Sequence, residues 1–191
     1  MSLDTTKIVS NTKKYFETAT KHGFMNDELT AFLGEDFIKA PASPMERNNN
    51  AFEGGLIDHL LRVASYAVRI NNSLPEDEKV NQTSLLKVCL LHQIGKAKYF
   101  IPNPSEWHKK SQGKMYNFNN DLVSMRVGER SAFYAISHGI ILSEEEYAAI
   151  INYDKEGDKM LDYYNSMLGE LLKMGLTLAI KHEQKLVNND K

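Results

Sequence analysis

Two histidines stand in two of the most apolar segments of the chain, and imidazole is the side chain best suited to acid–base chemistry or metal binding near neutral pH. His59 follows Gly-Gly-Leu-Ile-Asp, and His92 lies in Leu-Leu-His-Gln-Ile-Gly-Lys. A buried imidazole is costly unless both ring nitrogens have partners. The two residues alone therefore allow two interpretations: hydrogen-bonded core histidines, which are commoner in an arbitrary protein, or metal ligands and bases.

Basic side chains accompany both histidines. Arg62 follows His59 by about one helical turn, and Lys96 follows His92 within the next turn of the chain. Arg130, further along, could line the same cleft. Imidazole, ammonium and guanidinium groups with few opposing carboxylates suit a phosphate or nucleotide anion. The alternative is that Arg62 and Lys96 are solvated or form structural ion pairs.

Helices are the elements expected to position these residues. The apolar positions of residues 56–70 cover more than one helical face, which indicates an interior helix around His59. Residues 85–91 are the most apolar stretch and form the expected central helix before His92. Further helices are expected at residues 5–20, from Asn26 onward, and at 128–137, 143–153 and 164–186, with Asn26 as an N-cap and Ser143 and Glu146 as a capping box. Strand signals are nearly absent, so the predicted fold class is all-α.

One long segment departs from this pattern. Residues 99–121 contain two prolines, Gly113 and several asparagines, and they are expected to form a long loop with a short β-hairpin near residues 114–118. A chain of 191 residues is by default one domain. We expect N-terminal helices at 1–35, a core at 36–186 and a tail at 187–191.

The composition is that of an ordinary globular protein, with 42% hydrophobic and 25% charged residues. A net charge of −2 gives no global footprint for nucleic acid or an anionic membrane. No apolar run is long enough for a membrane span, and the first residues lack the pattern of a signal peptide. The single cysteine, Cys89, excludes an intramolecular disulfide. The cytoplasm is therefore the expected location.

The order and spacing of these motifs resemble the HD-domain phosphohydrolase superfamily. The resemblance rests on Gly-Gly-Leu-Ile-Asp-His59-Leu-Leu-Arg-Val and, some thirty residues later, on Leu-Leu-His92-Gln-Ile-Gly-Lys. The segments 37–56, 128–131 and 142–150 are similar to a branch common in phages and bacteria, so that about residues 30 to 182 are covered. The resemblance implies an all-helical fold and an origin in a phage, with the protein acting in the host cytoplasm.

In that family a divalent metal is held by a histidine, a His-Asp doublet and a later aspartate, and the metal-bound water attacks phosphorus. The resemblance assigns His59 as the first ligand and His92 as the histidine of the doublet. Gln93 stands where the aspartate of the doublet is expected, and the later aspartate falls on Leu176 or Gly175. Two neutral imidazoles without a carboxylate leave a 2+ ion in a partly buried site uncompensated.

Histidines that some members use are also replaced, because the corresponding positions hold Asn49-Asn50, Val127 and Tyr153. Tyr153, Tyr134 and Trp107 could stack on a nucleobase, although aromatic residues at helical spacing are more often core residues. The carboxylates that could substitute for the missing ligands are Asp58, Asp121, Glu129, Asp154 and Asp158.

Three functions are consistent with this site. The preferred one is a pseudoenzyme that binds or sequesters a phosphorylated small molecule such as a nucleotide, with no resident cofactor. Its expected ligand-binding residues are His59, Arg62, His92, Gln93, Lys96, Arg130 and Tyr153, with Lys96 and Arg62 as the phosphate contacts. The second is an active phosphohydrolase with a rearranged site, in which His59 and His92 hold Mn, Fe, Ni, Zn or Mg. The third is a non-catalytic module that binds a protein partner.

Overall fold

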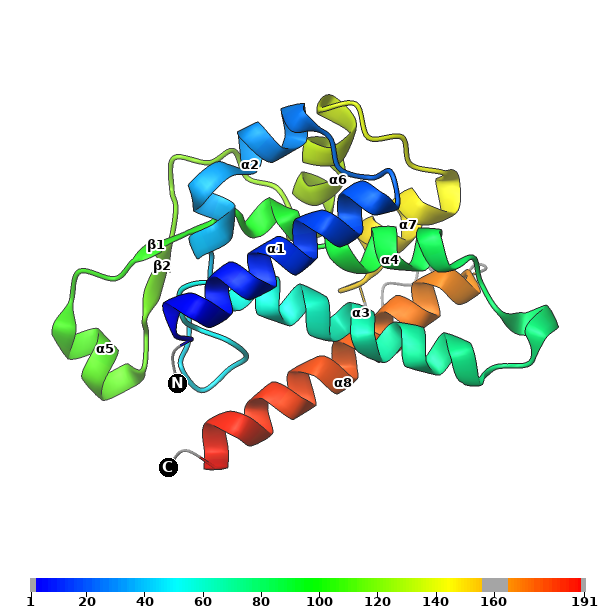
Figure 1. The fold of residues 1–191 in the computed structure, drawn as a ribbon. Coiled ribbons are helices and arrows are strands. Elements are labelled where there is room, and N and C mark those ends of the chain that lie inside the picture. The colour runs from blue at the N-terminus through cyan, green and yellow to red at the C-terminus, as the bar shows by residue number, and fades with distance from the viewer. Residues whose placement is uncertain (1–2, 156–164, 190–191) are drawn as a thin grey trace.

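The computed structural model of the protein describes residues 3–155 and 165–189, and the regular structure in this part of the chain is almost entirely helical (Figure 1). The helices are α1 (Thr5–Lys21), α2 (Asp27–Lys39), α3 (Gly55–Ser73), α4 (Gln82–Leu91), α5 (Glu106–Gln112), α6 (Val127–Ser137), α7 (Glu144–Asn152) and α8 (Met167–Asn189). Two short 3-10 helices, η1 (Glu76–Glu78) and η2 (Ile94–Lys96), and two three-residue strands, β1 (Phe100–Pro102) and β2 (Tyr116–Phe118), complete the elements. The predicted all-α class is confirmed.

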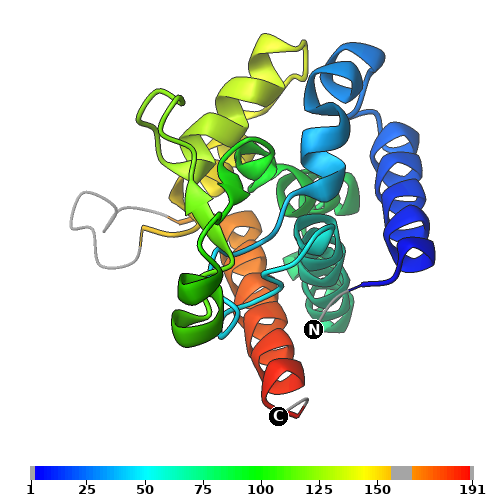
Figure 2. The ribbon, with the colours of Figure 1, turned by 90° about the vertical axis from the view of Figure 1, so that its left-hand side faces the viewer.

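Helix α3 is the centre of the packing. It contacts α8, α4, α1 and α2, and it lies between α1 and α8 in Figure 2. Its buried positions recur on successive turns, as the apolar pattern of residues 56–70 predicts, so that α3 packs against helices on more than one of its sides. Helix α4 carries the fully buried run of residues 88–91 and is the predicted central helix before His92.

A single hydrophobic core joins α1 to α4 and α6 to α8. Its members run from Tyr15 in α1 to Ala179 in α8. Residues on both sides of position 35 contribute to it, since α2 crosses that boundary with only a kink at Gly34, where φ is +48°. The expected N-terminal helices at 1–35 and the expected core at 36–186 therefore pack together around the same hydrophobic core.

Local capping fixes where the helices begin, as expected from the sequence. The Asn26 side chain accepts a hydrogen bond from the Leu29 amide at the start of α2. Ser143 and Glu146 form a reciprocal capping box at the start of α7. These side chains satisfy amide groups that have no partner within the first turn of a helix.

The segment 99–121 is more regular than the expected loop. Strands β1 and β2 pair antiparallel, with Phe100 opposite Phe118, and α5 connects them. The β-structure expected near residues 114–118 is present as β2, and its partner β1 lies about sixteen residues earlier, beyond α5. Ser105 caps α5 and Gly113 ends it in a left-handed conformation, two signals that could have revealed this short helix.

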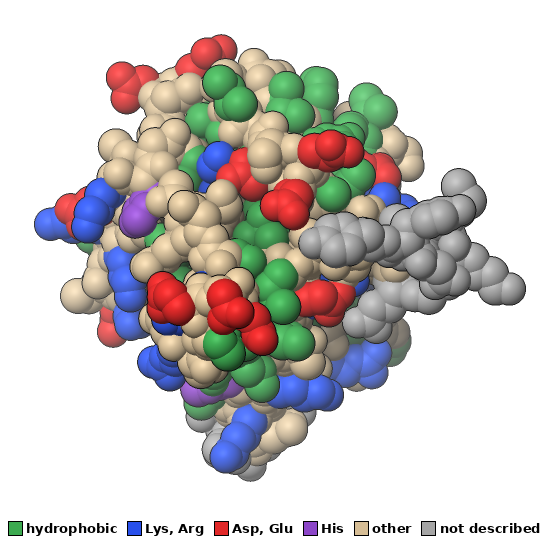
Figure 3. Space-filling view, turned by 90° about the vertical axis from the view of Figure 1, so that its right-hand side faces the viewer, with side chains coloured by type: hydrophobic (Ala, Val, Ile, Leu, Met, Phe, Trp, Pro, Cys, Tyr) green, Lys and Arg blue, Asp and Glu red, His purple; other side chains and the backbone are tan. Residues whose placement is uncertain are grey.

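Two further features concern the surface and the end of the chain. Helix α8 continues to Asn189 and so includes part of the expected tail at 187–191; its expected start at residue 164 lies outside the described residues. No helix among the described residues is long and apolar enough to span a membrane. On the face drawn in Figure 3, acidic side chains lie among hydrophobic ones, and basic side chains lie mostly lower down.

Candidate functional site

The structure brings the two histidines of the apolar segments together. His59 lies in the first half of α3, His92 caps the C-terminus of α4, and both side chains are fully buried. Their ring centroids are 6.5 Å apart. Because α3 and α4 pack against each other, residues 33 positions apart in sequence become neighbours in the core.

Hydrogen bonds indicate the tautomer of each ring. The Nδ1 atom of His92 lies 2.9 Å from the Cys89 carbonyl oxygen, and that of His59 lies 3.0 Å from Oε2 of Glu183. Both oxygens accept, so Nδ1 is the donor in each ring and Nε2 carries the lone pair when the ring is neutral. Both Nε2 atoms are buried without a hydrogen-bond partner in the described structure. Burial lowers the pKa of His92 well below its ordinary value, and His59 and Lys96 lower it further.

The carboxylate that contacts His59 comes from Glu183 of α8, a residue that the sequence analysis did not consider. Its side chain is completely buried, and it also accepts a hydrogen bond of 3.1 Å from Nε of Arg62. Arg62 donates a second bond of 2.8 Å to Asp58. Asp58 accepts further bonds from Asn11 and Asn50. The guanidinium expected to bind phosphate is therefore held between two carboxylates.

A signal for Glu183 was present in the sequence. At 100° per residue, Glu183 falls on the same side of α8 as the buried Leu172 and Ala179. An acidic residue on an apolar stripe requires a buried partner, because an unpaired buried carboxylate is costly. Here the partners are His59 and Arg62.

Lys96, Gln93 and Tyr153 surround His92 on its other side. The Lys96 ammonium donates to Oε1 of Gln93 at 2.8 Å and to the Ala42 carbonyl oxygen at 2.6 Å. Burial lowers the pKa of Lys96 to about 8, while the charge of Glu183 and that of Asp154 oppose this shift. The residue as a whole is nevertheless partly exposed.

Tyr153 closes the site above His92. Its ring packs edge-on against the imidazole, with the centroids 4.8 Å apart, and its hydroxyl group forms a hydrogen bond with Gln93. Burial, followed by the charge of Asp154, raises the pKa of the Tyr153 hydroxyl. Tyr153 is therefore a packing and hydrogen-bonding residue of the site, which leaves little of its ring for stacking on a base.

Arg130 lies beside the turn that carries Lys96, because a Cβ added to Gly95 would approach Cβ of Arg130 to 2.9 Å. Its guanidinium donates through Nη2 to the Val123 carbonyl oxygen and lies 5.9 Å from the Tyr99 ring centroid. Its Nε atom is buried and has no hydrogen-bond partner in the described structure. Arg130 is thus adjacent to the site without a hydrogen bond to either histidine.

The described residues do not fit a divalent metal ion. The two Nε2 lone pairs are suitable ligands, but Oε1 of Gln93 accepts from the Lys96 ammonium, and both oxygens of Glu183 are used by His59 and Arg62. Within residues 3–155 and 165–189, no group of three His, Cys, Asp or Glu side chains is arranged to hold a metal. A nearby ammonium would in addition repel the cation.

The position of the family's later aspartate is used for packing instead. Gly175 lies against α3, where an added Cβ would come within 2.8 Å of the Val63 carbonyl oxygen. Leu176 packs on the edge of the core. A carboxylate therefore reaches His59 from a point about two helical turns further along α8.

The remaining candidate residues form no hydrogen bond with either histidine in the described structure, although the charge of Asp154 acts on Lys96 and Tyr153. Glu129 pairs with Lys155 at 3.7 Å, Asp121 and Asp154 are exposed, and Asp158 lies outside the described residues. Trp107 is 64% exposed on α5, and Tyr134 packs in the core against Phe32.

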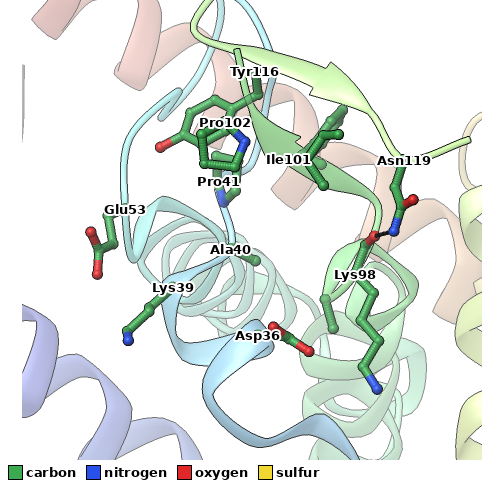
Figure 4. Close-up of a pocket in the computed structure, with 12 residues that line it drawn as sticks. Asp36, Lys39, Ala40, Pro41, Glu53, Lys98, Ile101, Pro102, Tyr116 and Asn119 are labelled. Carbon is green, nitrogen blue, oxygen red and sulfur yellow. Dashed lines mark hydrogen bonds between the residues drawn. The ribbon is translucent and has the colours of Figure 1, made fainter. Parts of the chain in front are cut away.

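A surface pocket of ≈ 400 Å³ lies between the end of α2, the following loop and the β1–β2 pair (Figure 4). It is lined by Asp36, Lys39, Ala40, Pro41, Glu53, Ala97, Lys98, Phe100, Ile101, Pro102, Tyr116 and Asn119, and it contains none of the residues expected at the site.

Comparison with known families agrees with this geometry. A model of the HD domain matches residues 56–182, which is more than half of the chain and extends from α3 into α8. The chain therefore belongs to the HD-domain family, whose members are metal-dependent phosphohydrolase-like proteins. Neither the curated proteins nor the solved structures contain a significant match.

Proposed function

We propose that this HD-domain protein binds a phosphorylated small molecule, such as a nucleotide, and does not hydrolyse it. The observation that carries the proposal is the Lys96 ammonium beside the His59–His92 pair, in a site whose described residues offer no set of ligands for a divalent metal because the Glu183 carboxylate is already bonded to His59 and Arg62. A fixed ammonium attracts a phosphate, but it does not generate a metal-bound hydroxide.

Lys96 is the expected primary phosphate contact. Lys96 as a residue is partly exposed, whereas both histidines are fully buried, so Lys96 is the most accessible of the three residues. With a pKa of about 8, the ammonium is largely protonated at pH 7. Arg130, whose Nε lacks a partner in the described structure, is the proposed second contact. Arg62 contributes less, because its guanidinium is already held between the carboxylates of Asp58 and Glu183.

The proposal is tested by a thermal-shift screen with nucleoside mono-, di- and triphosphates and cyclic dinucleotides, followed by calorimetry on any hit. Lys96→Met should abolish the shift, and Lys98→Met, a matched change two residues away, should retain it. Loss of the shift in both variants, or in neither, would contradict the role of Lys96.

Absence of hydrolysis is tested separately. Protein purified without chelator should contain far less than one equivalent of metal, and manganese should not stimulate phosphatase activity. One equivalent of bound metal together with phosphate release that disappears in His92→Ala would instead establish the active phosphohydrolase with a rearranged site.

A second candidate, a non-catalytic module that binds a protein partner, is favoured by the complete burial of His59 and His92. In this function the former cleft is filled and the ion pairs of Arg62 maintain the fold. It would replace the first proposal if no phosphorylated ligand raises the melting temperature. The resemblance to phage and bacterial members makes the cytoplasm of a bacterial host the proposed location for either function.

A further inference from the structure

Helix α8 carries an exposed apolar stripe on the face opposite Glu183. Met167, Met174 and Leu178 are 42%, 48% and 43% exposed. At 100° per residue they lie within about 40° of arc. These exposures show that the stripe faces away from the core. Large apolar side chains gathered on one exposed helix face are typical of an interaction surface.

Charged residues lie on the same side of α8 as the stripe. Glu170 lies before the apolar centre, and the exposed Lys181 and Lys185 lie after it on the same side of the helix. Glu170 is 43% exposed at its side chain, and its partners within the chain are Lys173, at 3.6 Å, and Asn165. The stripe therefore carries an acidic residue, Glu170, between Met167 and Met174 in its N-terminal half, and basic residues at its C-terminal end.

This pattern is complementary to itself in the antiparallel direction. A two-fold axis near position 176 places Met174 of one copy opposite Leu178 of the other. The same axis brings Glu170 of one copy to within one residue, about 1.5 Å along the axis, of Lys181 of the other. Met167 then faces the aliphatic stem of Lys185. The symmetry repeats each contact twice, which is how an isologous interface is formed.

We propose that the partner of this surface is a second copy of the chain, bound through an antiparallel α8–α8 contact. The apolar centre supplies the burial, and the two Glu170–Lys181 pairs fix the register and the direction. An interface made by one helix from each copy is at the small end of specific contacts, so the dimer is weak and reversible. Glu183 lies on the other side of α8, so both copies retain their histidine sites.

Sedimentation equilibrium of the whole chain, from about 10 µM to about 1 mM, covers the dissociation range of such a weak complex. The unaltered protein should show a concentration-dependent monomer–dimer equilibrium. Met174→Glu should weaken it by about tenfold or more, because two carboxylates enter the apolar centre. Phe133→Glu is the matched control, since Phe133 is 57% exposed on α6 and outside the stripe.

The ion pairs provide a second and independent test. Glu170→Lys and Lys181→Glu should each weaken the dimer, and the protein carrying both changes should recover it, because the pairs are re-formed with reversed charges. All the substituted residues of both tests lie on the surface, so circular dichroism should show unchanged helix content. These residues are Phe133, Glu170, Met174 and Lys181. A protein that stays monomeric at about 1 mM, a dimer unaffected by Met174→Glu, or charge reversals without recovery in the double variant would each overturn the proposal.

Discussion

Replacing Glu183 should be among the most damaging single substitutions on α8. Its buried carboxylate accepts hydrogen bonds from His59 and Arg62, and each bond to a charged group contributes about 1.5 to 3 kcal/mol. The part from Arg62 must be discounted, because that side chain is 24% exposed and keeps its bond to Asp58. The His59 contact then accounts for about 2 kcal/mol and the Arg62 contact for about 1 kcal/mol. We therefore expect Glu183→Ala to lower the free energy of unfolding by about 3 kcal/mol.

Urea denaturation followed by circular dichroism measures this loss, with an unchanged slope showing that the unfolding reaction is the same. Glu183→Gln keeps one acceptor and should lose about half as much. Lys185→Ala removes an exposed charge from the same helix and should change stability by less than about 0.5 kcal/mol. If Glu183→Ala cost no more than Lys185→Ala, the buried His59–Glu183–Arg62 network would not stabilise the fold, and the reasoning would be refuted.

Three further predictions concern buried groups. The pKa of His92 is depressed in the folded protein, so the unfolded chain binds more protons below about pH 6.5, and stability should fall as the pH drops through that value. His92→Gln should flatten this dependence in urea titrations at pH 5 to 8. An unchanged slope of stability against pH in the variant would contradict the prediction. Gly175→Ala should cost about 1 to 3 kcal/mol, since the new methyl group meets the Val63 backbone, whereas the exposed Thr177→Ala should be nearly neutral in the same assay. The Cys89 thiol, whose pKa is raised by burial, should react with a thiol reagent only after urea unfolds the protein, and rapid labelling of the folded protein would show that the core opens locally.

The helical framework could be read from the sequence because its signals are local. Apolar periodicity located α3 and α4, and side-chain caps located the starts of α2 and α7. The short helix α5 was missed because its seven residues have no apolar stripe of their own, and only the flanking Ser105 and Gly113 mark it. The pairing of β1 with β2 was missed because it joins segments separated by a helix.

The candidate site likewise has features that the sequence predicts and features that only the packing of the helices fixes. The sequence by itself determined that His59 and His92 lie in buried helical segments and that Gln93 follows His92, since these features depend on residue identity and local pattern. Which carboxylate reaches His59 depended on where α8 crosses α3. The close contact at Gly175 fixes that crossing, and it places Glu183, about two turns later, beside the imidazole.

The partners of the basic side chains were likewise decided only by the tertiary structure. Nothing local distinguishes an arginine that binds phosphate from one that pairs with carboxylates, because the side chain has the same donors in either case. Packing of α8 on α3 brought Glu183 to Arg62, while the turn after α4 directed Lys96 toward Gln93. A long side chain takes its partner from elements distant in sequence, and their arrangement is set by the burial of the whole core.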